Sequence, residues 1–202
     1  MKSERILECA FDEMAVRGIK HASVDNIASR MHISKKTIYD LFENKEKLLL
    51  MALKCKIGKI IAGFSDPLSD GRNVLSSIIC NALHLFKFVY SVTPSFYKEI
   101  ELFSSIKGYV DSVKVVMMES GKKRVEEGKE MGYFREDADF SIVGKLFELQ
   151  AISMFEDDKR KYTPLQICFY SFMIILRGIC TEKGVRFIEE NFDEAYMEKL
   201  LR

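Results

Sequence analysis

The chain has 202 residues, enough to bury a substantial core, and its content of 48% hydrophobic and 30% charged residues is that of an ordinary globular protein. Three prolines, eleven glycines and few alternating apolar runs argue against a β-rich fold and favour an all-helical one. The net charge of +1 excludes a uniformly basic surface for nucleic acid, although a small part of the chain can still be locally basic.

Five cysteines are scattered along the chain without a C-x-x-C pair: Cys9, Cys55, Cys80, Cys168 and Cys180. Residues 1–4 lack a secretory pattern, so we expect reduced, packed thiols in a cytoplasmic protein; the alternative, a redox sensor, has no support in the spacing. No apolar stretch reaches the roughly 18 residues of a membrane span. The nearest is 165–180, and polar residues interrupt it.

Residues 2–17 have the pattern of an amphipathic helix, and Gly18 is a natural C-terminal stop. One side of this helix is apolar, with Ile6, Leu7, Ala10, Phe11, Met14 and Ala15. The other side carries Glu4, Glu8, Asp12 and Glu13, which we expect to face solvent.

Two short helices joined by a tight turn are predicted for residues 23–42. In the first, Val24, Ile27, Ala28 and Met31 follow helical spacing. Ser23, Ser34 and Asn44 each stand where a side-chain oxygen can cap the start of a helix. The second helix is too short to be stable alone, so its neighbours must hold it.

The second short helix has an apolar side and a polar side. A helical wheel turns Ile38, Leu41 and Phe42 inward. Long or polar side chains occupy its start, its flanks and its outer face: Lys35, Lys36, Thr37, Tyr39 and Asp40. This is the chemistry of a helix that enters the major groove of DNA, where polar groups reach base edges and phosphates.

The run S-V-x-x-I-A followed by I-S-K-x-T-I-Y-x-x-F-x-N-K-x-x-L, within residues 23–48, resembles the DNA-binding domain of the TetR family of transcriptional regulators. The first helix and Gly18 resemble that family's first helix and closing turn. The resemblance implies a helix-turn-helix DNA-binding head at residues 1–47, a linker helix at 44–64 and a helical ligand-binding and dimerisation body at 48–202. His32, Asp40 and Leu41 depart from the usual pattern of the family, so the operator sequence is not implied.

The resemblance also indicates which residues contact DNA: Ser34, Lys35, Lys36, Thr37, Tyr39, Asp40 and Lys45. Lys45 has two interpretations. In one, it is a tolerated surface lysine offset by Glu46. In the other, a DNA phosphate is the anion that the start of this helix attracts, bound by Lys45 and by free backbone N–H groups.

Six further helices are expected in the body, at about 72–91, 95–103, 105–131, 139–155, 163–180 and 186–201, separated by breaks such as 65–71 and a charged loop at 156–161. Residues 132–139 resemble the G-x-[IF]-R-x-D-x-D connection of the same family. The helices at 139–155 and 163–180 are apolar on more than one side, which indicates that a second copy covers them in a two-fold homodimer.

No catalytic or metal-binding pattern occurs: H-E-x-x-H, a phosphate loop and G-x-G-x-x-G are all absent, and the three histidines are interpreted as surface or packed residues. We expect neither an enzyme nor a cofactor. The resemblance places a set of mostly aromatic side chains around a ligand pocket, with ordinary core as the alternative: Phe86, Tyr90, Phe103, Tyr109, Met117, Phe147 and Gln150. Such a lining suits a mostly apolar or aromatic molecule.

The sequence therefore predicts a cytoplasmic, homodimeric DNA-binding regulator. We expect a repressor that a small effector releases from double-stranded operator DNA. The alternative is a helical interaction module of the same fold that regulates by binding another protein. An all-helical enzyme is the least favoured class.

Overall fold

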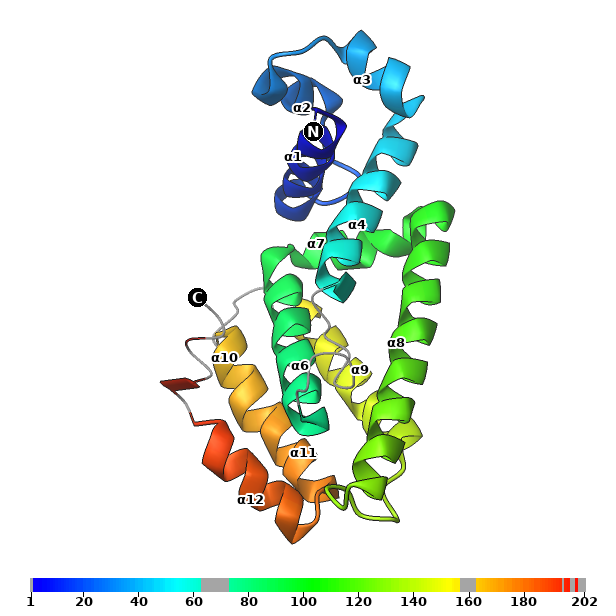
Figure 1. Ribbon diagram of the computed structural model, residues 1–202. Helices are drawn as coiled ribbons and strands as arrows, with labels where there is room; N and C mark the ends of the chain where they lie inside the picture. Colours follow the sequence, from blue (N-terminus) through cyan, green and yellow to red (C-terminus); the bar gives the residue numbers. More distant parts are fainter. Residues whose placement is uncertain (1, 63–72, 157–162, 194, 197–198, 200–202) are drawn as a thin grey trace. The chain divides into compact units, whose positions relative to one another are not determined.

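A computed structural model of the chain shows helices joined by short turns (Figure 1). It describes residues 2–62, 73–156, 163–193, 195–196 and 199. Within these ranges there is no strand, and one isolated antiparallel bridge joins Phe134 to Cys180. The predicted all-helical class is confirmed. The predicted break at 65–71 and residues 157–161 of the predicted charged loop lie outside the described residues, whereas Glu156 is helical.

Packing divides the chain into two compact units. The first unit comprises residues 1–62 and 91–113, and the second comprises residues 63–90 and 114–202. The predicted division after residue 47 concerns function, and it stays a prediction. The two compact units do not coincide with the two predicted domains, because residues 91–113 pack with the N-terminal helices. We call residues 91–113 the clasp.

The N-terminal helices of the first unit are α1 (Lys2–Arg17), α2 (Val24–Met31), α3 (Lys35–Phe42) and α4 (Lys45–Ala62) (Figure 1). Helix α1 packs on α2 and α4, and α3 packs on α2 and α4. Their apolar stripes meet in one core, which includes Ile6, Met14, Ile19, Ile27, Ile38, Leu48, Leu49 and Leu53. The predicted bounds of the first helix agree with α1.

The sequence pattern placed one acidic residue of α1 on the wrong side of the helix. Glu13 was expected to face solvent, but it is buried at 6% exposure. Its Oε1 accepts a hydrogen bond of 2.8 Å from Asn26 Nδ2 and lies 3.0 Å from Arg17 Nε. Burial of this carboxylate is tolerated because both partners satisfy it, and it ties α1 to α2.

The clasp consists of the end of α6, then α7 (Pro94–Glu99), the 3₁₀ turn η1 (Ile100–Leu102) and the start of α8 (Ser104–Glu130). Thr93 caps α7, and its N–H donates to the carbonyl of Ala15 at 2.9 Å. The rings of Phe96 and Phe11 meet edge to face at 6.3 Å. These contacts fix α7 against α1.

The turn after α1 is closed by a residue of the clasp. Gly18 has φ of +84°, which L side chains rarely adopt, and its N–H donates to Met14 O at 2.9 Å. Oε2 of Glu99 accepts from the Lys20 N–H at 2.7 Å and would lie only 2.7 Å from a Cβ at residue 18. The positive φ therefore favours glycine here, and the carboxylate of Glu99 would have to shift to make room for a Cβ.

The second unit contains most of α6 (Val74–Ser91), the rest of α8, α9 (Phe140–Glu156), α10 (Pro164–Ile167), the π-helical turn η2 (Cys168–Phe172), α11 (Met173–Ile179) and α12 (Glu182–Asn191). The segments α10, η2 and α11 follow one another directly, so the predicted helix at 163–180 is present with a π turn inside it. Phe172 joins two other helices, with its ring 6.4 Å from Phe86 and 5.0 Å from Phe147.

Residues 132–139 fasten the end of α8 to the turn between α11 and α12. The Arg135 N–H donates to Ile179 O at 3.0 Å, and the Thr181 N–H donates to Tyr133 O at 2.9 Å. Asp139 caps α9 by accepting from the Ser141 N–H, whereas Asp137 pairs with Arg135 at 2.6 Å. Asp139, and not Asp137, is therefore the residue that caps α9.

Two expectations for the second unit were wrong. The last helix was predicted at 186–201, but α12 begins at Glu182, because Thr181 caps it by accepting from the Gly184 N–H, and it ends at Asn191. Residues 195, 196 and 199 are helical again, and the predicted end at 201 lies outside the described residues. In addition, α6 is long and apolar enough to cross a membrane if length and composition alone are considered. Many of its apolar side chains are buried in the second unit, as in an ordinary core helix.

Candidate DNA-binding site

The turn between α2 and α3 is built by short-range hydrogen bonds. Ser23 Oγ accepts from the Asn26 N–H at 3.4 Å at the start of α2, and Ser34 Oγ accepts from the Thr37 N–H at 3.0 Å at the start of α3. Between them, His32 is left-handed with φ of +53° and ψ of +45°. The Ile33 N–H donates to Ala28 O at 3.0 Å, which closes α2. His32 thus adopts the conformation for which glycine is the usual residue.

Helix α3 presents a polar outer face. Ile38 and Phe42 are buried at 0% and 2% exposure, while Lys35, Lys36 and Asp40 are exposed and Tyr39 is 40% exposed. The predicted inward and outward sides are therefore present. The two buried residues anchor the helix, so its polar side chains lie along one accessible edge of the first unit.

Leu41 is the exception to the predicted wheel. It was expected to point inward, but it is 51% exposed. The reason is that α3 is a short helix whose element contacts are with α2 and α4, so the buried arc is narrow. Leu41 adds an apolar group beside the polar edge, a feature that the pattern of apolar residues alone could not separate from a core position.

Several charges near α3 are already paired. Lys35 Nζ lies 2.5 Å from Asp25 Oδ1 on α2, and Lys47 pairs with Glu43. For Lys36 the described part of the chain offers no ion pair. Because exposed ion pairs contribute little to stability, DNA phosphates can compete for the paired lysines.

The start of α4 is capped as the sequence predicts: Asn44 Oδ1 accepts from the Lys47 N–H at 2.9 Å. The Lys45 side chain does not extend into solvent. Its Nζ donates to the carbonyl of Lys20 at 2.8 Å. Burial lowers the pKa of Lys45, and the charge of Glu99 acts in the opposite direction. Lys45 therefore joins α4 to the turn after α1, and it keeps two further N–H donors.

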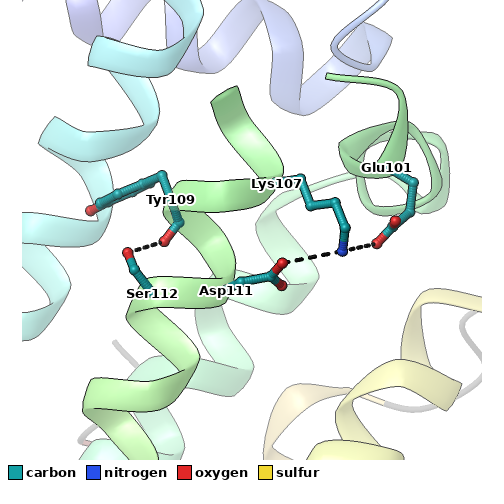
Figure 2. A network of polar contacts seen from close by, with 5 residues as sticks. All are labelled: Glu101, Lys107, Tyr109, Asp111 and Ser112. Atoms are coloured by element: carbon teal, nitrogen blue, oxygen red, sulfur yellow. Dashed lines mark hydrogen bonds and ion pairs between the residues drawn. The ribbon is translucent and has the colours of Figure 1, made fainter. Parts of the chain in front are cut away.

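The clasp holds α4 at two further points. Ser105 Oγ donates to Glu46, and Lys54 Nζ lies 5.4 Å from the centroid of the Tyr109 ring. Figure 2 shows how the clasp is braced internally, with Lys107 Nζ between Glu101 at 3.1 Å and Asp111 at 3.2 Å. Ser112 Oγ donates to the Tyr109 carbonyl at 2.6 Å in the same network (Figure 2).

The residues predicted to line a ligand pocket are divided between the units. Phe86 and Phe147 share contact with Phe172 in the second unit. Tyr90 and Met117 belong to the same unit and are half-buried. Phe103 and Tyr109 belong to the clasp, where burial raises the pKa of Tyr109. The side chain of Gln150 lies outside the described residues.

Metal binding finds no support in the described ranges, which contain no group of three or more His, Cys, Asp or Glu side chains that could hold an ion. The free cysteines also fail to form a pair there. Cys9 and Cys180 are buried, and burial raises the pKa of both thiols, that of Cys180 to about 12.

Comparison with known proteins agrees with the helix-turn-helix geometry. Residues 6–52, which include α2, α3 and the start of α4, match the family described as bacterial regulatory proteins, tetR family. The N-terminal domain belongs to the TetR family. The proteins of this family are DNA-binding transcriptional regulators and not enzymes, and this domain places the chain in that class. Among curated protein sequences, none matches this chain.

Solved structures of transcriptional regulators share the fold over most of the chain. A transcriptional regulator from Saccharomonospora viridis in complex with choline has a TM-score of 0.73 at 19% identity, covering 89% of this chain and 98% of that one. A TetR regulator from Chloroflexus aurantiacus has a TM-score of 0.70 at 18% identity, covering 87% and 92%. The regulator FadR from Bacillus subtilis in complex with stearoyl-CoA has a TM-score of 0.65 at 16% identity, covering 87% and 98%.

Proposed function

We propose that this TetR-type regulator is a homodimeric repressor whose α3 helices enter the major groove of operator DNA. The observation that carries this proposal is the polar edge of α3, held outward by the buried Ile38 and Phe42 and fixed in register by the Ser34 cap. Such an edge on a short helix is the geometry that recognition helices use to reach base edges.

The side chains of α3 divide into two roles under this proposal. Ser34, Thr37 and Tyr39 lie at the start and flank of the helix, and Lys45 lies at the start of the next one, where hydroxyl and ammonium groups bind phosphate. Lys36 and Asp40 are four residues apart on the outer face and face the bases. Lys36 suits guanine, and the carboxylate of Asp40 suits the amino group of cytosine.

Leu41 enters this proposal because it is exposed. A half-exposed leucine beside the polar edge of α3 is suited to contact the methyl group of thymine, which is the one apolar feature of the major groove. Lys35 remains a proposed phosphate ligand, and DNA binding would exchange its pairing with Asp25 for one with a phosphate.

Binding to the DNA upstream of its own gene tests the function directly. We expect saturable binding in fluorescence anisotropy that weakens steeply between 50 and 200 mM salt, by roughly 10³-fold or more if six or more phosphates are contacted. Tyr39→Ala is expected to weaken binding by roughly tenfold with an unchanged melting temperature, since Tyr39 is partly exposed. The matched control is Val16→Ala on α1, an exposed position away from α3.

Failure of the wild-type dimer to bind this DNA would contradict the repressor and favour the interaction module. Asp40→Asn separates base reading from charge repulsion. It should change sequence preference more than affinity, and uniform tightening on every sequence would indicate repulsion of phosphate alone.

The homodimer is supported by exposed apolar side chains of the second unit. Ile142, Leu146 and Leu149 form one stripe along α9, with exposures of 64%, 47% and 52%. Ile174 on α11 is 66% exposed. Exposed apolar residues of this kind are typically covered by a partner, and two copies would form a four-helix contact.

Light scattering after size exclusion tests the dimer. We expect wild type at twice the chain mass, and a monomer for the double variant Ile142→Glu with Ile174→Glu. The control is Val115→Glu with Val116→Glu, which changes two exposed apolar residues of α8 outside the stripe. A monomeric wild type, or a control that dissociates equally, would contradict this interface.

Release by an effector has a physical route within the first unit. The clasp contacts α1 through Thr93 and Phe96, and it contacts α4 through Ser105 and Tyr109. The chain continues from both ends of the clasp into the second unit through α6 and α8. An effector that prefers one arrangement of the second unit would thereby move α1 and α4, and with them α3, by as much as its differential affinity allows.

A further inference from the structure

Two oxygen atoms on one side of α6 are buried without hydrogen-bond partners among the described residues. Ser77 is 0% exposed, and neither its Oγ nor Oδ1 of Asn81 has a partner. The two residues are four apart in a helix, so they lie one above the other on the same face. Because buried polar atoms are nearly always hydrogen-bonded, such a pair calls for an explanation.

Helix α8 faces this part of α6. A Cβ on Gly128 would lie 3.5 Å from Val74 Cγ1, and the two helices run in opposite directions (Figure 1). The residues one turn before Gly128 on α8 therefore lie at the same level as the residues one turn after Val74 on α6. That position of α8 is Arg124, a half-buried residue whose guanidinium donates to Ser120 Oγ.

The donor and acceptor types of the pair select the chemistry of a ligand. A serine hydroxyl can donate and accept, whereas Oδ1 of Asn81 only accepts. A single ligand hydroxyl satisfies both by accepting from Ser77 and donating to Asn81. A ketone or an ether would leave Asn81 without a donor, and the positive charge of Arg124 at the same level disfavours an ammonium group.

The surroundings select the rest of the molecule. Val74, three residues before Ser77 on the same side of α6, is buried, and so is Val125, three residues before Gly128 on α8. The ring of Phe140 packs on Gly121, seven residues before Gly128 on α8. A ligand whose hydroxyl lies at Ser77 would thus have an apolar or aromatic remainder, which is the usual division of a small-molecule site into apolar walls and few polar groups.

We propose that Ser77 and Asn81 bind the hydroxyl group of a neutral alcohol or phenol with an apolar body, and that they form the polar end of the effector site. This inference rests on the proposed effector binding by the regulator, and it adds the chemical class of the effector and two residues that recognise it.

Stability of the ligand-free protein gives the first test. Removing a buried hydroxyl that has no partner relieves a desolvation penalty, so Ser77→Ala should melt at the same temperature as wild type or higher. Ser76→Ala, one position away on another face, is the matched control. A melting temperature of Ser77→Ala several degrees below both would mean that the hydroxyl is already satisfied, by an internal water or by the helix backbone, and would overturn the proposal.

Matched probes give the second test. Calorimetry would compare 2-naphthol with naphthalene, and 1-octanol with octane, which differ only in the hydroxyl. For at least one pair, wild type should bind the alcohol about tenfold more tightly, the factor expected for one well-placed hydrogen bond. Ser77→Ala should lose this preference and bind the hydrocarbon as wild type does. Equal binding of both members of each pair by wild type, or a preference that survives in Ser77→Ala, would overturn the proposal.

DNA binding separates this proposal from the function on which it rests. Ser77→Ala and Asn81→Leu should bind the DNA upstream of the gene as wild type does when no probe is present, since neither residue belongs to the first unit. If no probe binds while that DNA still does, the hydroxyl site is overturned and the DNA-binding regulator stands. If the wild type fails to bind the DNA but retains the alcohol preference, the repressor is overturned and the hydroxyl site stands.

Discussion

In the first unit the buried carboxylate of Glu13 has partners in Asn26 and Arg17, whereas in the second unit the buried oxygens of Ser77 and Asn81 have none among the described residues. The outer surfaces differ in the opposite sense, because α3 presents polar groups and α9 presents an apolar stripe. Among the described residues, the buried oxygens without partners thus lie in the second unit, while the first unit presents a polar surface on α3. We therefore propose different partners for the two units: DNA for the polar edge of α3 in the first unit, and for the second unit an alcohol or phenol with an apolar body and a second copy of the chain.

The two units also differ in what fixes their turns. In the first unit the turns that position α3 and α4 are closed by residues three positions apart, as in the Ser34 and Asn44 caps. In the second unit the turn before α12 is closed by residues about fifty positions apart, as in the hydrogen bond from the Thr181 hydroxyl to Gly132 O at 2.7 Å. The difference makes the α3 region predictable from sequence and the α12 region dependent on long-range contacts.

The largest expected effect contrasts adjacent residues of α3. Ile38→Ala removes a fully buried side chain and should lower the free energy of unfolding by about 2–5 kcal/mol. Tyr39→Ala should change it by less than about 0.5 kcal/mol, because that side chain is partly exposed. Urea unfolding followed by circular dichroism measures both. Equal destabilisation by the two substitutions would show that the assignment of inner and outer faces is wrong.

The second prediction concerns two glycines near α12. A Cβ at Gly184 would lie 2.3 Å from the carbonyl oxygen of Tyr133, and backbone cannot easily yield, so Gly184→Ala should cost about 1–3 kcal/mol. Gly178→Ala is the control, with nothing within 4 Å of its Cβ, and it should be neutral or stabilise by about 0.5–1 kcal/mol. A Gly184→Ala protein as stable as the control would refute the close approach of Tyr133.

The third prediction tests the local capping of α3. Ser34→Ala removes the acceptor of the Thr37 N–H and should cost about 1 kcal/mol. Ser29→Ala, an exposed position inside α2, should cost nothing measurable, since alanine is the better helix former. Thermal unfolding measures the pair, and DNA affinity should fall for Ser34→Ala alone. If Ser29→Ala were the more destabilising, the cap would not be what holds α3.

The smallest effect concerns cysteine chemistry in the two units. The pKa of Cys180 is raised to about 12 by burial, so the folded protein keeps this proton when the unfolded chain, near 9.0, has lost it. Its contribution to stability is therefore complete below pH 9 and declines as the pH rises from 9 toward 12. At pH 8, iodoacetamide should modify the half-buried Cys55 well before Cys180. Mass spectrometry of the folded protein checks the order, and faster modification of Cys180 would contradict its burial.

Local patterns were sufficient wherever neighbours in sequence supply the contacts. The bounds of α1, the caps at Ser23, Ser34 and Asn44, and the outward position of Lys36 and Asp40 all follow from helical periodicity and side-chain chemistry. The family resemblance of residues 23–48 follows from the same local constraints, since a tight turn and a narrow buried arc permit few residue types. These features were predicted and are confirmed.

Long-range packing decided what the sequence left open or placed wrongly. Leu41 is exposed because α3 meets too few neighbours to cover three apolar groups, and Glu13 is buried because Asn26 lies within reach of its carboxylate. The start of α12 at Glu182 depends on hydrogen bonds to residues 132 and 133, which no local pattern contains. The sequence by itself determined most of the helices and the polar outer face of α3. Only the tertiary structure decided how residues 91–113 join the N-terminal helices and which polar atoms of α6 are buried without partners, because both depend on residues distant in the chain.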